Sequence, residues 1–531
     1  MKKIISLALS GFGAFISISS VAQTYAEEAL LFSRISPGGS ARVQAMGGSQ
    51  VALGGDYSSA FSNPAGLGFF NRSEATFSMG MNFYNSSSSY FTGPQQSPPV
   101  PESTTNDSKS NFNIPGFSVV FHNDKNSGKL VSGNFALSFS RTNNFNQNFT
   151  YHGYNQDNSL IDYFIEQSNG DHPHDPNYYP SQFQQDGAAY YTLPALGYQN
   201  YLFGPMSEIA KGGDSSQYHT YFSKVPLQYE QVQTSGAQNQ FNISYGLNFN
   251  DFFYLGATVG FPSFNYHSKK TYSETFDPNA PNTLLGFDLA EDYSIKGSGI
   301  NTTIGAIIKP KDFIQLGLSI ATPTYFYSVA DNYSATLTST WDNYSYVDIT
   351  YPSNNRLLNG SFSSTFDQEL IANYTLTTPW RFKAGATVFI QKHGLITAEI
   401  EQVNYGKSSL SSQTDGLDFS SDNEEIKSTF KSVTNIRIGG EYRFSKFRAR
   451  LGYCYMPDPY VTIRNNTNNS INSYSAGFGY RTGKFFADLG VIYSQWNSSY
   501  NPYTVYYHGQ NPVVKLQNSN TNVMITVGIN L

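Results

Sequence analysis

The sequence predicts an all-β protein, a 14-stranded antiparallel transmembrane β-barrel with an N-terminal plug in the lumen. Three observations support this prediction. Apolar and polar residues alternate in many segments whose length matches membrane strands of about 9–11 residues. Charged residues make up only 13% of the chain and aromatic residues 16%, with 40 Tyr and 41 Phe against 3 Trp. The segments are joined alternately by tight turns and long loops, which is typical of outer-membrane barrels.

The first 22 residues (1–22) have the pattern of a secretory signal peptide. Lys2 and Lys3 precede an apolar stretch at 4–18, and Ser20-Val21-Ala22 supplies a small-x-small cleavage site. This stretch is too short for a spanning helix, and no later segment approaches about 18 consecutive apolar residues. We therefore expect export to the bacterial outer membrane, with cleavage before Gln23.

Residues 23–73 fit no strand pattern. Glycine pairs separate short stretches, of which 40–46 and 57–62 have the spacing of helical turns. The segment is too small for a free domain and too apolar for a linker. Because a barrel of about 14 strands has a lumen that its own side chains do not fill, we expect this segment to be a plug.

The barrel is predicted over 74–531, and its first strand shows the alternation most clearly. Phe77 and Met79 share one face, and Ser78 and Gly80 share the other. The segments with this pattern make 14 strands, although their uncertain boundaries also allow 12 or 16. They are 74–84, 112–122, 129–142, 236–250, 252–267, 290–309, 312–341, 364–392, 394–408, 430–444, 446–463, 467–481, 484–500 and 518–531.

The loops predicted on the outer side are 85–111, 143–235, 268–289, 342–363, 409–429 and 501–517. The 143–235 loop is too long to be featureless, and both 158–167 and 188–203 have helical spacing. We expect these helices to cover the outer mouth. Their apolar residues indicate either a ligand or partner site or packing onto the barrel rim.

The last nine residues end on the apolar phase of an alternating strand, in Val527, Ile529 and Leu531. Such an end resembles the terminal strand by which the outer-membrane barrel assembly machinery recognises its substrates, although Phe is the usual last residue there.

Strand parity places a belt of charged residues in the lumen, since a charge facing lipid costs about 2–4 kcal/mol near the midplane. One interpretation of this lumen charge belt is an ion-pair network that holds the plug, and the other is a substrate path. Its predicted members are Arg381, Lys383, Glu399, Glu401, Arg437, Glu441, Arg443, Arg448, Arg450 and Asp488.

Several functional classes find no support. The net charge of −6 gives no footprint for nucleic acid, and a single cysteine, Cys454, allows no intramolecular disulfide. Serine-hydrolase, zinc-protease and phosphate-loop signatures are missing. The tract Asp171-His172-Pro173-His174-Asp175 and the acidic run 415–425 are weak metal signals, and whether the loops hold Ca²⁺ stays open. We predict no enzyme, no cofactor and no metal site.

Short motifs in the plug and the strands resemble the FadL/TodX family of outer-membrane transporters of long-chain fatty acids and hydrophobic compounds, notably its Bacteroidetes-like branch. The resemblance covers about 33–82 and 236–531. The plug motifs are Gly39-Ser40-Ala41-Arg42, Ala45-Met46-Gly47-Gly48, Asp56-Tyr57-Ser58-Ser59-Ala60 and Asn63-Pro64-Ala65-Gly66-Leu67. The strand motifs include Thr322-Pro323, Thr378-Pro379-Trp380, 438–443 and 477–481.

The resemblance implies a 14-stranded barrel, a hydrophobic pocket near the outer mouth and release of ligand sideways through the wall. It carries the plug motif onto Gly47, Gly48, Asp56, Asn63, Pro64 and Ala65. It also suggests that the residues before that motif reach into the ligand pocket. The pocket candidates are Leu30, Leu31, Phe32 and Ile35.

The function that we expect is passive uptake of hydrophobic small molecules by a monomer surrounded by outer-membrane lipids. The resemblance implies long-chain fatty acids as the default ligands. The alternative is a FadL-like barrel that serves protein export, as the type IX secretion shuttle barrels do. The plug motif cannot separate the two, because both kinds of barrel carry it. An adhesin or receptor is disfavoured because it would have no evident use for the plug.

Overall fold

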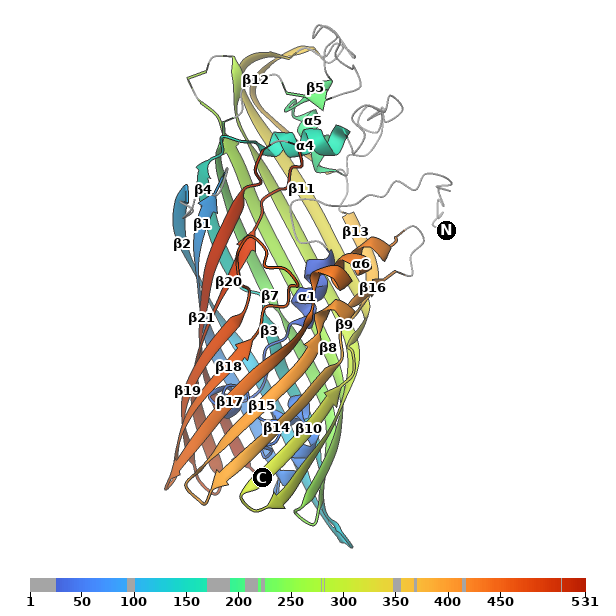
Figure 1. The fold of residues 1–531 in the computed structure, drawn as a ribbon, viewed down its shortest axis with the longest axis vertical. Helices are drawn as coiled ribbons and strands as arrows, with labels where there is room; N and C mark the ends of the chain where they lie inside the picture. Colours follow the sequence, from blue (N-terminus) through green and yellow to red (C-terminus); the bar gives the residue numbers. More distant parts are fainter. Residues whose placement is uncertain are drawn as a thin grey trace.

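The computed structural model describes residues 25–92, 101–169, 192–205, 218–220, 225–277, 279–280, 282–346, 355–366, 370–412, 417–507 and 509–531. The predicted signal peptide lies outside the described residues. Nineteen strands form one antiparallel sheet. The first strand, β1 (Glu74–Phe91), pairs with both β2 (Ser103–Ser127) and the last strand, β21 (Val513–Asn530), so the sheet closes into a tall barrel (Figure 1).

The nineteen strands occupy 14 positions around the barrel, which confirms the predicted architecture. Some positions hold two or three strands in line, because short non-strand segments interrupt them, as at Pro323 between β10 and β11 and at Pro379 between β13 and β14. The positions after β2 are β3 (Leu130–Asn144) with β4 (Gln147–Tyr154), β7 (Leu227–Phe249), β8 (Phe253–Thr275), β9 (Thr283–Lys311), β10 (Ile314–Ala321) with β11 (Tyr325–Tyr346), β12 (Arg356–Thr365) with β13 (Leu370–Thr377) and β14 (Arg381–Ile390), β15 (Gly394–Asn404) with β16 (Ser409–Ser411), β17 (Ser432–Phe444), β18 (Phe447–Met456), β19 (Ile471–Arg481) and β20 (Phe485–Tyr500).

The strands alternate between an apolar outer face and a polar inner face. On β1, Phe77 and Met79 are exposed on the outside, whereas Ser78 and Asn82 are buried on the inside. The predicted parity of this strand is therefore confirmed. The other strands repeat the pattern, so the barrel carries an apolar outer band that suits contact with lipid tails.

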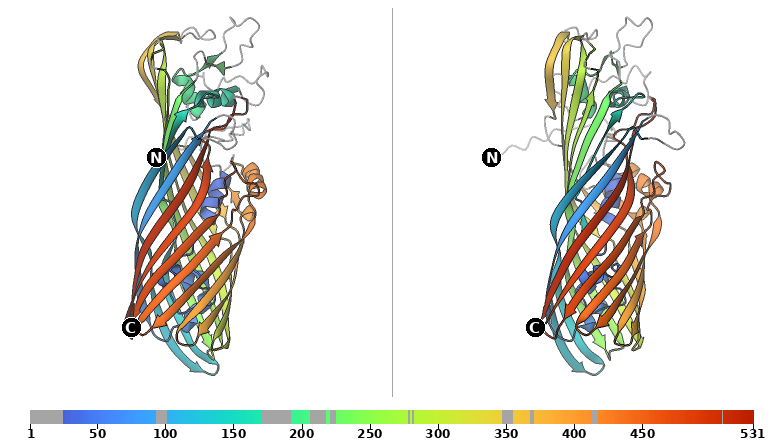
Figure 2. Two further views of the ribbon diagram at one scale, coloured as in Figure 1. Left: turned by 60° about the vertical axis from the view of Figure 1, so that its left-hand side comes forward. Right: turned by 90° about the vertical axis from the view of Figure 1, so that its left-hand side faces the viewer.

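Several strands are longer than predicted, and others are shorter. β4 and the start of β7 fall within the predicted 143–235 loop, and β11 and β12 extend into the predicted 342–363 loop. The predicted strand 446–463 ends instead at Met456, where β18 ends. Above the apolar band both faces of a strand are polar, as in Asn85–Ser89 of β1, so the alternation that reveals a strand is lost there. Figure 2 shows β11 and β12 rising well above the shorter strands.

Two helices cover the outer mouth, α4 (Leu160–Asn169) and α5 (Leu193–Gln199). α4 overlaps the predicted range 158–167 and ends two residues beyond it, and α5 lies within the predicted range 188–203. They pack with the two-stranded β5 (Gly204–Pro205) and β6 (Tyr218–His219) against the tall strands, in an apolar cluster that includes Phe164 and Trp341. Lower down, η4 (Tyr405–Lys407) and α6 (Ser420–Thr429) follow β15. Within the described ranges, no helix is long and apolar enough to cross a membrane.

Cysteine labelling along β20 tests the assignment of inner and outer faces. Val491 is exposed on the outer band, whereas Ser494 faces inward and lines a cavity. In a bilayer, and in a Cys454→Ser background, we expect Ser494→Cys to react with a water-soluble maleimide and Val491→Cys to react only with a lipid-soluble one. Equal reaction of both variants with the water-soluble reagent would contradict the assignment.

Candidate functional site

Residues 25–72 lie inside the barrel, as the blue segment of Figure 1 shows. They form α1 (Tyr25–Ser33), α2 (Ala41–Gln44), α3 (Ser59–Ser62) and η1 (Pro64–Phe69), joined by turns. These elements are short, and most of their side chains are buried against the inner wall. The backbone of this N-terminal segment also binds the wall directly, since the Ala41 amide donates to Thr526 Oγ1 at 2.8 Å.

A ring of wall glycines lets the N-terminal segment approach the barrel closely. A Cβ atom built on any of them would lie 3.0 Å or less from an atom of the segment, a distance that real Cβ atoms do not tolerate. Several are direct cross-strand neighbours, such as Gly439 and Gly452, so the ring follows one level around the wall. Its members are Gly116, Gly246, Gly256, Gly305, Gly317, Gly385, Gly439, Gly452, Gly477 and Gly490.

The Asn63-Pro64-Ala65 motif sits against this ring. The Asn63 side-chain amide donates to the backbone carbonyls of Val51 (2.6 Å), Leu318 (3.2 Å) and Ala306 (3.3 Å). Its oxygen accepts from the Ala65 amide at 3.2 Å and so caps η1, whose first residue is Pro64. One side chain therefore joins the N-terminal segment to β9 and β10.

The other motif residues shape the turns of the segment. Gly47 and Gly48 have φ values of +69° and +77°, which residues with side chains rarely adopt. The buried Asp56 carboxylate accepts from the Ser58 amide (3.0 Å), from Ser58 Oγ (2.6 Å) and from Ser40 Oγ (2.7 Å). It thereby ties the start of α2 to the start of α3.

The lumen charge belt forms two groups of ion pairs. In the first, Arg437 binds Glu399 (2.8 Å) and Glu401 (2.5 Å), and Glu401 also binds Arg381 (2.9 Å) and Lys383 (3.9 Å).

In the second group, Glu441 binds Arg443 (2.6 Å) and Arg450 (2.8 Å), and Arg450 binds Asp488 (2.7 Å). Arg448 also faces inward, but its guanidinium donates to the carbonyls of Ser445 and Phe447 at the turn.

The belt also binds the N-terminal segment. Glu399 accepts from the Gln50 and Val51 amides at 2.9 and 3.0 Å, and Arg381 donates to the Ser33 carbonyl. Arg42 of the segment lies 3.5 Å from Glu441 and joins the second group. Strand parity could not identify Arg42 as a member, because it belongs to no strand.

The four pocket candidates do not share one environment. Leu30 and Leu31 of α1 line a cavity of about 460 Å³ beneath the outer mouth. Phe32 stacks on Phe264 with ring centroids 3.7 Å apart and meets Phe145 edge-on. Ile35 lines a separate small void beside the lumen charge belt.

The helix α1 buries a carboxyl group that no sequence pattern indicated. Glu28 is 5% exposed and accepts from Tyr374 Oη at 3.0 Å and from the Tyr293 hydroxyl. The pKa of Glu28 is raised to about 8, chiefly by burial and also by the nearby Asp331, although the hydrogen bonds from Tyr293 and Tyr374 lower it in part. Glu28 is thus a neutral acid at the pH where most carboxyl groups are charged.

The wall of the barrel is interrupted between β2 and β3. Their ladder stops at the pair Gly116–Ser140, next to a bulge at Pro115, which has no amide hydrogen to donate. Above this point, within the described residues, no backbone hydrogen bond joins β2 to β3 or β4. We call this gap in the ladder, 103–115 against 141–154, the wall seam.

Side chains close the upper part of the wall seam, and the lumen cavity borders its lower part. Asp107 accepts from the Thr150 amide and hydroxyl at 2.7 and 2.9 Å. Below it, Lys109 donates across the seam to the Thr234 carbonyl of β7 at 2.8 Å, and lower still Asn144 donates to Asn111 at 3.4 Å. Pro115 and 141–146 line the 460 Å³ cavity. Phe112 and Ile114 are exposed on the outer face beside the seam. The cavity therefore meets the apolar exterior where the wall is held least tightly.

Metal-binding groups are not evident among the described residues. No cluster of three His, Cys, Asp or Glu side chains could hold a metal ion there. The Asp171–Asp175 tract lies outside the described residues.

No protein-family model matches the chain, and no curated protein matches it by sequence. Its structure is similar to that of a Pseudomonas aeruginosa FadL homologue, with a TM-score of 0.51 and 12% identity over 93% of this chain and 99% of that chain. This chain has the fold of that FadL homologue. The toluene transporters TodX of Pseudomonas putida (TM-score 0.47, 12% identity, 93% and 99% covered) and TbuX of Ralstonia pickettii (0.46, 12%, 92% and 98%) are less similar. The fold expected from the sequence motifs is thus confirmed.

Replacing Arg437 tests how strongly the lumen charge belt holds the structure. Arg437→Met leaves Glu399 and Glu401 buried without their shared partner, which costs about 3–5 kcal/mol. We expect a clear fall in the temperature at which the barrel loses its compact migration on a denaturing gel. Arg448→Met is the matched control, because Arg448 makes no ion pair in the described structure. An equal fall in both variants would contradict the assignment.

Because Glu28 is neutral when it is buried, we expect the docking of α1 in the barrel to depend on pH. Since the folded pKa of about 8 lies above the ordinary value, docking of α1 is strongest at low pH. It should weaken by up to about tenfold per pH unit between pH 5 and pH 8, and change little above that. Hydrogen–deuterium exchange over 25–33, corrected for intrinsic rates, measures this.

Glu28→Gln should abolish the pH dependence, since the amide cannot ionise, whereas Glu27→Gln should keep it. The same pH profile in Glu28→Gln as in the parent would rule out Glu28 as the cause.

Proposed function

We propose that this protein is an outer-membrane channel for passive uptake of hydrophobic small molecules, with long-chain fatty acids as the first candidates, and that it releases them sideways through the wall. The wall seam is the observation that carries this proposal. A cavity that borders a gap in the ladder, at the level of the apolar outer band, offers an apolar molecule a path that avoids crossing water.

The N-terminal segment supports a sideways rather than a straight route. It fills the lumen below the cavity and is bound to the wall through Asn63, the glycine ring and the lumen charge belt. We propose that residues 23–73 act as the plug and that the belt holds it in place. The fold that this chain shares with the FadL homologue agrees with this function.

The proposed pocket lies around α1. Leu30 and Leu31 supply apolar surface to the cavity, and Phe145 and Tyr266 line the same space near the wall seam. The cavity also carries many amide and hydroxyl groups, so a ligand with an apolar body and a polar head suits it better than a pure hydrocarbon. A fatty acid has that character. A single chain closes the barrel, so we propose that the monomer is the working unit.

Cross-linking the wall seam tests the route. Asn111→Cys with Asn144→Cys places two thiols across the lower seam, where the native side chains are 3.4 Å apart. Joining them with a short bifunctional thiol reagent should abolish uptake of a labelled fatty acid into liposomes, because the wall can no longer part.

The matched control is Ser118→Cys with Ser138→Cys, which joins two residues already paired in the ladder. This cross-link should leave uptake unchanged. Undiminished uptake through the cross-linked seam would refute the sideways route. If cells that lack the protein take up fatty acids normally but lose secreted proteins from their surface, the export alternative would replace uptake.

A further inference from the structure

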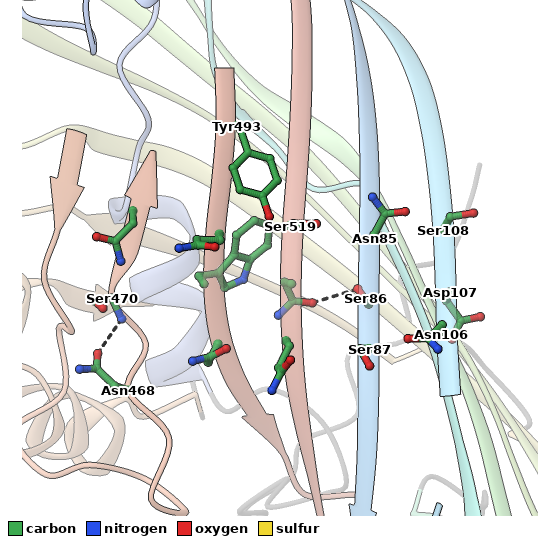
Figure 3. A pocket seen from close by; sticks show the side chains of 16 residues that line it. Asn85, Ser86, Ser87, Asn106, Asp107, Ser108, Asn468, Ser470, Tyr493 and Ser519 are labelled. Atoms are coloured by element: carbon green, nitrogen blue, oxygen red, sulfur yellow. Dashed lines mark hydrogen bonds between the residues drawn. The ribbon is translucent and has the colours of Figure 1, made fainter. Parts of the chain in front are cut away.

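The outer wall carries a second hollow, of about 820 Å³, on the far side of the strands from the lumen. It lies across five neighbouring strands, β2, β1, β21, β20 and β19, and on the turn before β19 (Figure 3). Asn85 and Ser87 of β1 belong to the outward phase, since Tyr84, Ser86 and Ser88 between and beside them are buried inside. We call this hollow the outer groove.

Cross-strand pairing arranges the outer groove in two rows. Asn85 is the neighbour of both Ser108 and Ser519, and Ser519 is the neighbour of Gln495. One step higher, Gln517 pairs with both Ser87 and Asn497. Each row is therefore an unbroken line of amides and hydroxyls, with neighbours about 5 Å apart.

The rows directly below the outer groove are aromatic and then apolar. Phe83, Tyr493 and Tyr474 occupy the next level on β1, β20 and β19, and all three are exposed. Met81 and Val523 follow below them. Aromatic girdles of membrane barrels lie at the level of the lipid headgroups. The outer groove thus begins where lipid tails end.

The groove is polar but almost free of charge. None of its lining residues is basic. Its one acidic residue, Asp107, accepts hydrogen bonds from Thr150 across the wall seam. Within the described residues, the side-chain amides of Asn85, Gln495 and Gln517 make no hydrogen bond to protein. They remain available as donors and acceptors.

We propose that the outer groove binds the neutral sugar headgroup of a glycolipid whose acyl chains lie on the apolar rows below. Dense, unpaired amides and hydroxyls match the alternating donors and acceptors of a sugar, and the Tyr493 ring offers it an apolar face. A phosphate headgroup would instead require arginine or lysine. The contact with lipid rests on the proposed membrane location.

Native mass spectrometry of the full chain in detergent tests this proposal with three probes: digalactosyl diacylglycerol, phosphatidylglycerol and free digalactose. We expect the parent to retain the neutral glycolipid in preference to both others. The variant Asn85→Ala/Gln495→Ala/Gln517→Ala should bind it at least about tenfold more weakly, because three hydrogen-bonding side chains are lost. The single variant Asn85→Ala should show a smaller loss.

The matched control is Gln231→Ala/Gln233→Ala, which removes two outward amides from β7, outside the groove. It should bind like the parent. Unchanged glycolipid binding in the triple variant, equal retention of phosphatidylglycerol, or equal binding of free digalactose would each overturn the proposal.

Fatty-acid uptake into liposomes separates this inference from the transport proposal. The triple variant should transport like the parent, because the groove lies outside the wall. If the parent fails to transport but the triple variant still loses the glycolipid, the transport proposal fails and the groove stands.

Discussion

The pairing of the first strand with the last is the constraint on which the rest of this structure depends. In a bilayer each unpaired backbone amide or carbonyl costs several kcal/mol, so a sheet must close on itself. β1 and β21 meet that requirement along their whole length. Once the sheet is closed, the apolar residues of every strand can face outward, and the polar ones face a lumen that must be filled.

The wall seam is an exception to this pairing of backbone groups, and it lies beside the lumen cavity. Pro115 removes a donor and ends the ladder, and the strands above it are held by side chains such as Asp107 instead of by backbone pairs. Side-chain contacts can part without unravelling the neighbouring strands, whereas a ladder cannot. The same chain therefore combines a rigid barrel with one flexible join, beside the cavity that α1 lines.

The sequence predicts those features that depend on one strand at a time. Alternation around Phe77 and Ser78 reveals a face, and the inward phase of Glu399 and Arg437 follows from their own strands. Partners across the barrel cannot be predicted in this way. Arg42 reaches Glu441 from a segment with no periodicity, and Glu28 is buried only because Tyr293 and Tyr374 surround it. The glycine ring cannot be predicted from the sequence, because a glycine has no side chain that would indicate which face of the strand it occupies.

That ring has a consequence for what the barrel would be without its contents. At Gly439 and Gly452 the wall contributes no side chain to the interior, since the N-terminal segment occupies that space, and their cross-strand neighbours Thr397 and Ser475 contribute only small ones. Were the segment absent, only glycines and small polar side chains such as Thr397 and Ser475 would line the bore at this height, and ions would flow through it. The electrical resistance of such a membrane would therefore depend on about fifty residues that belong to no strand.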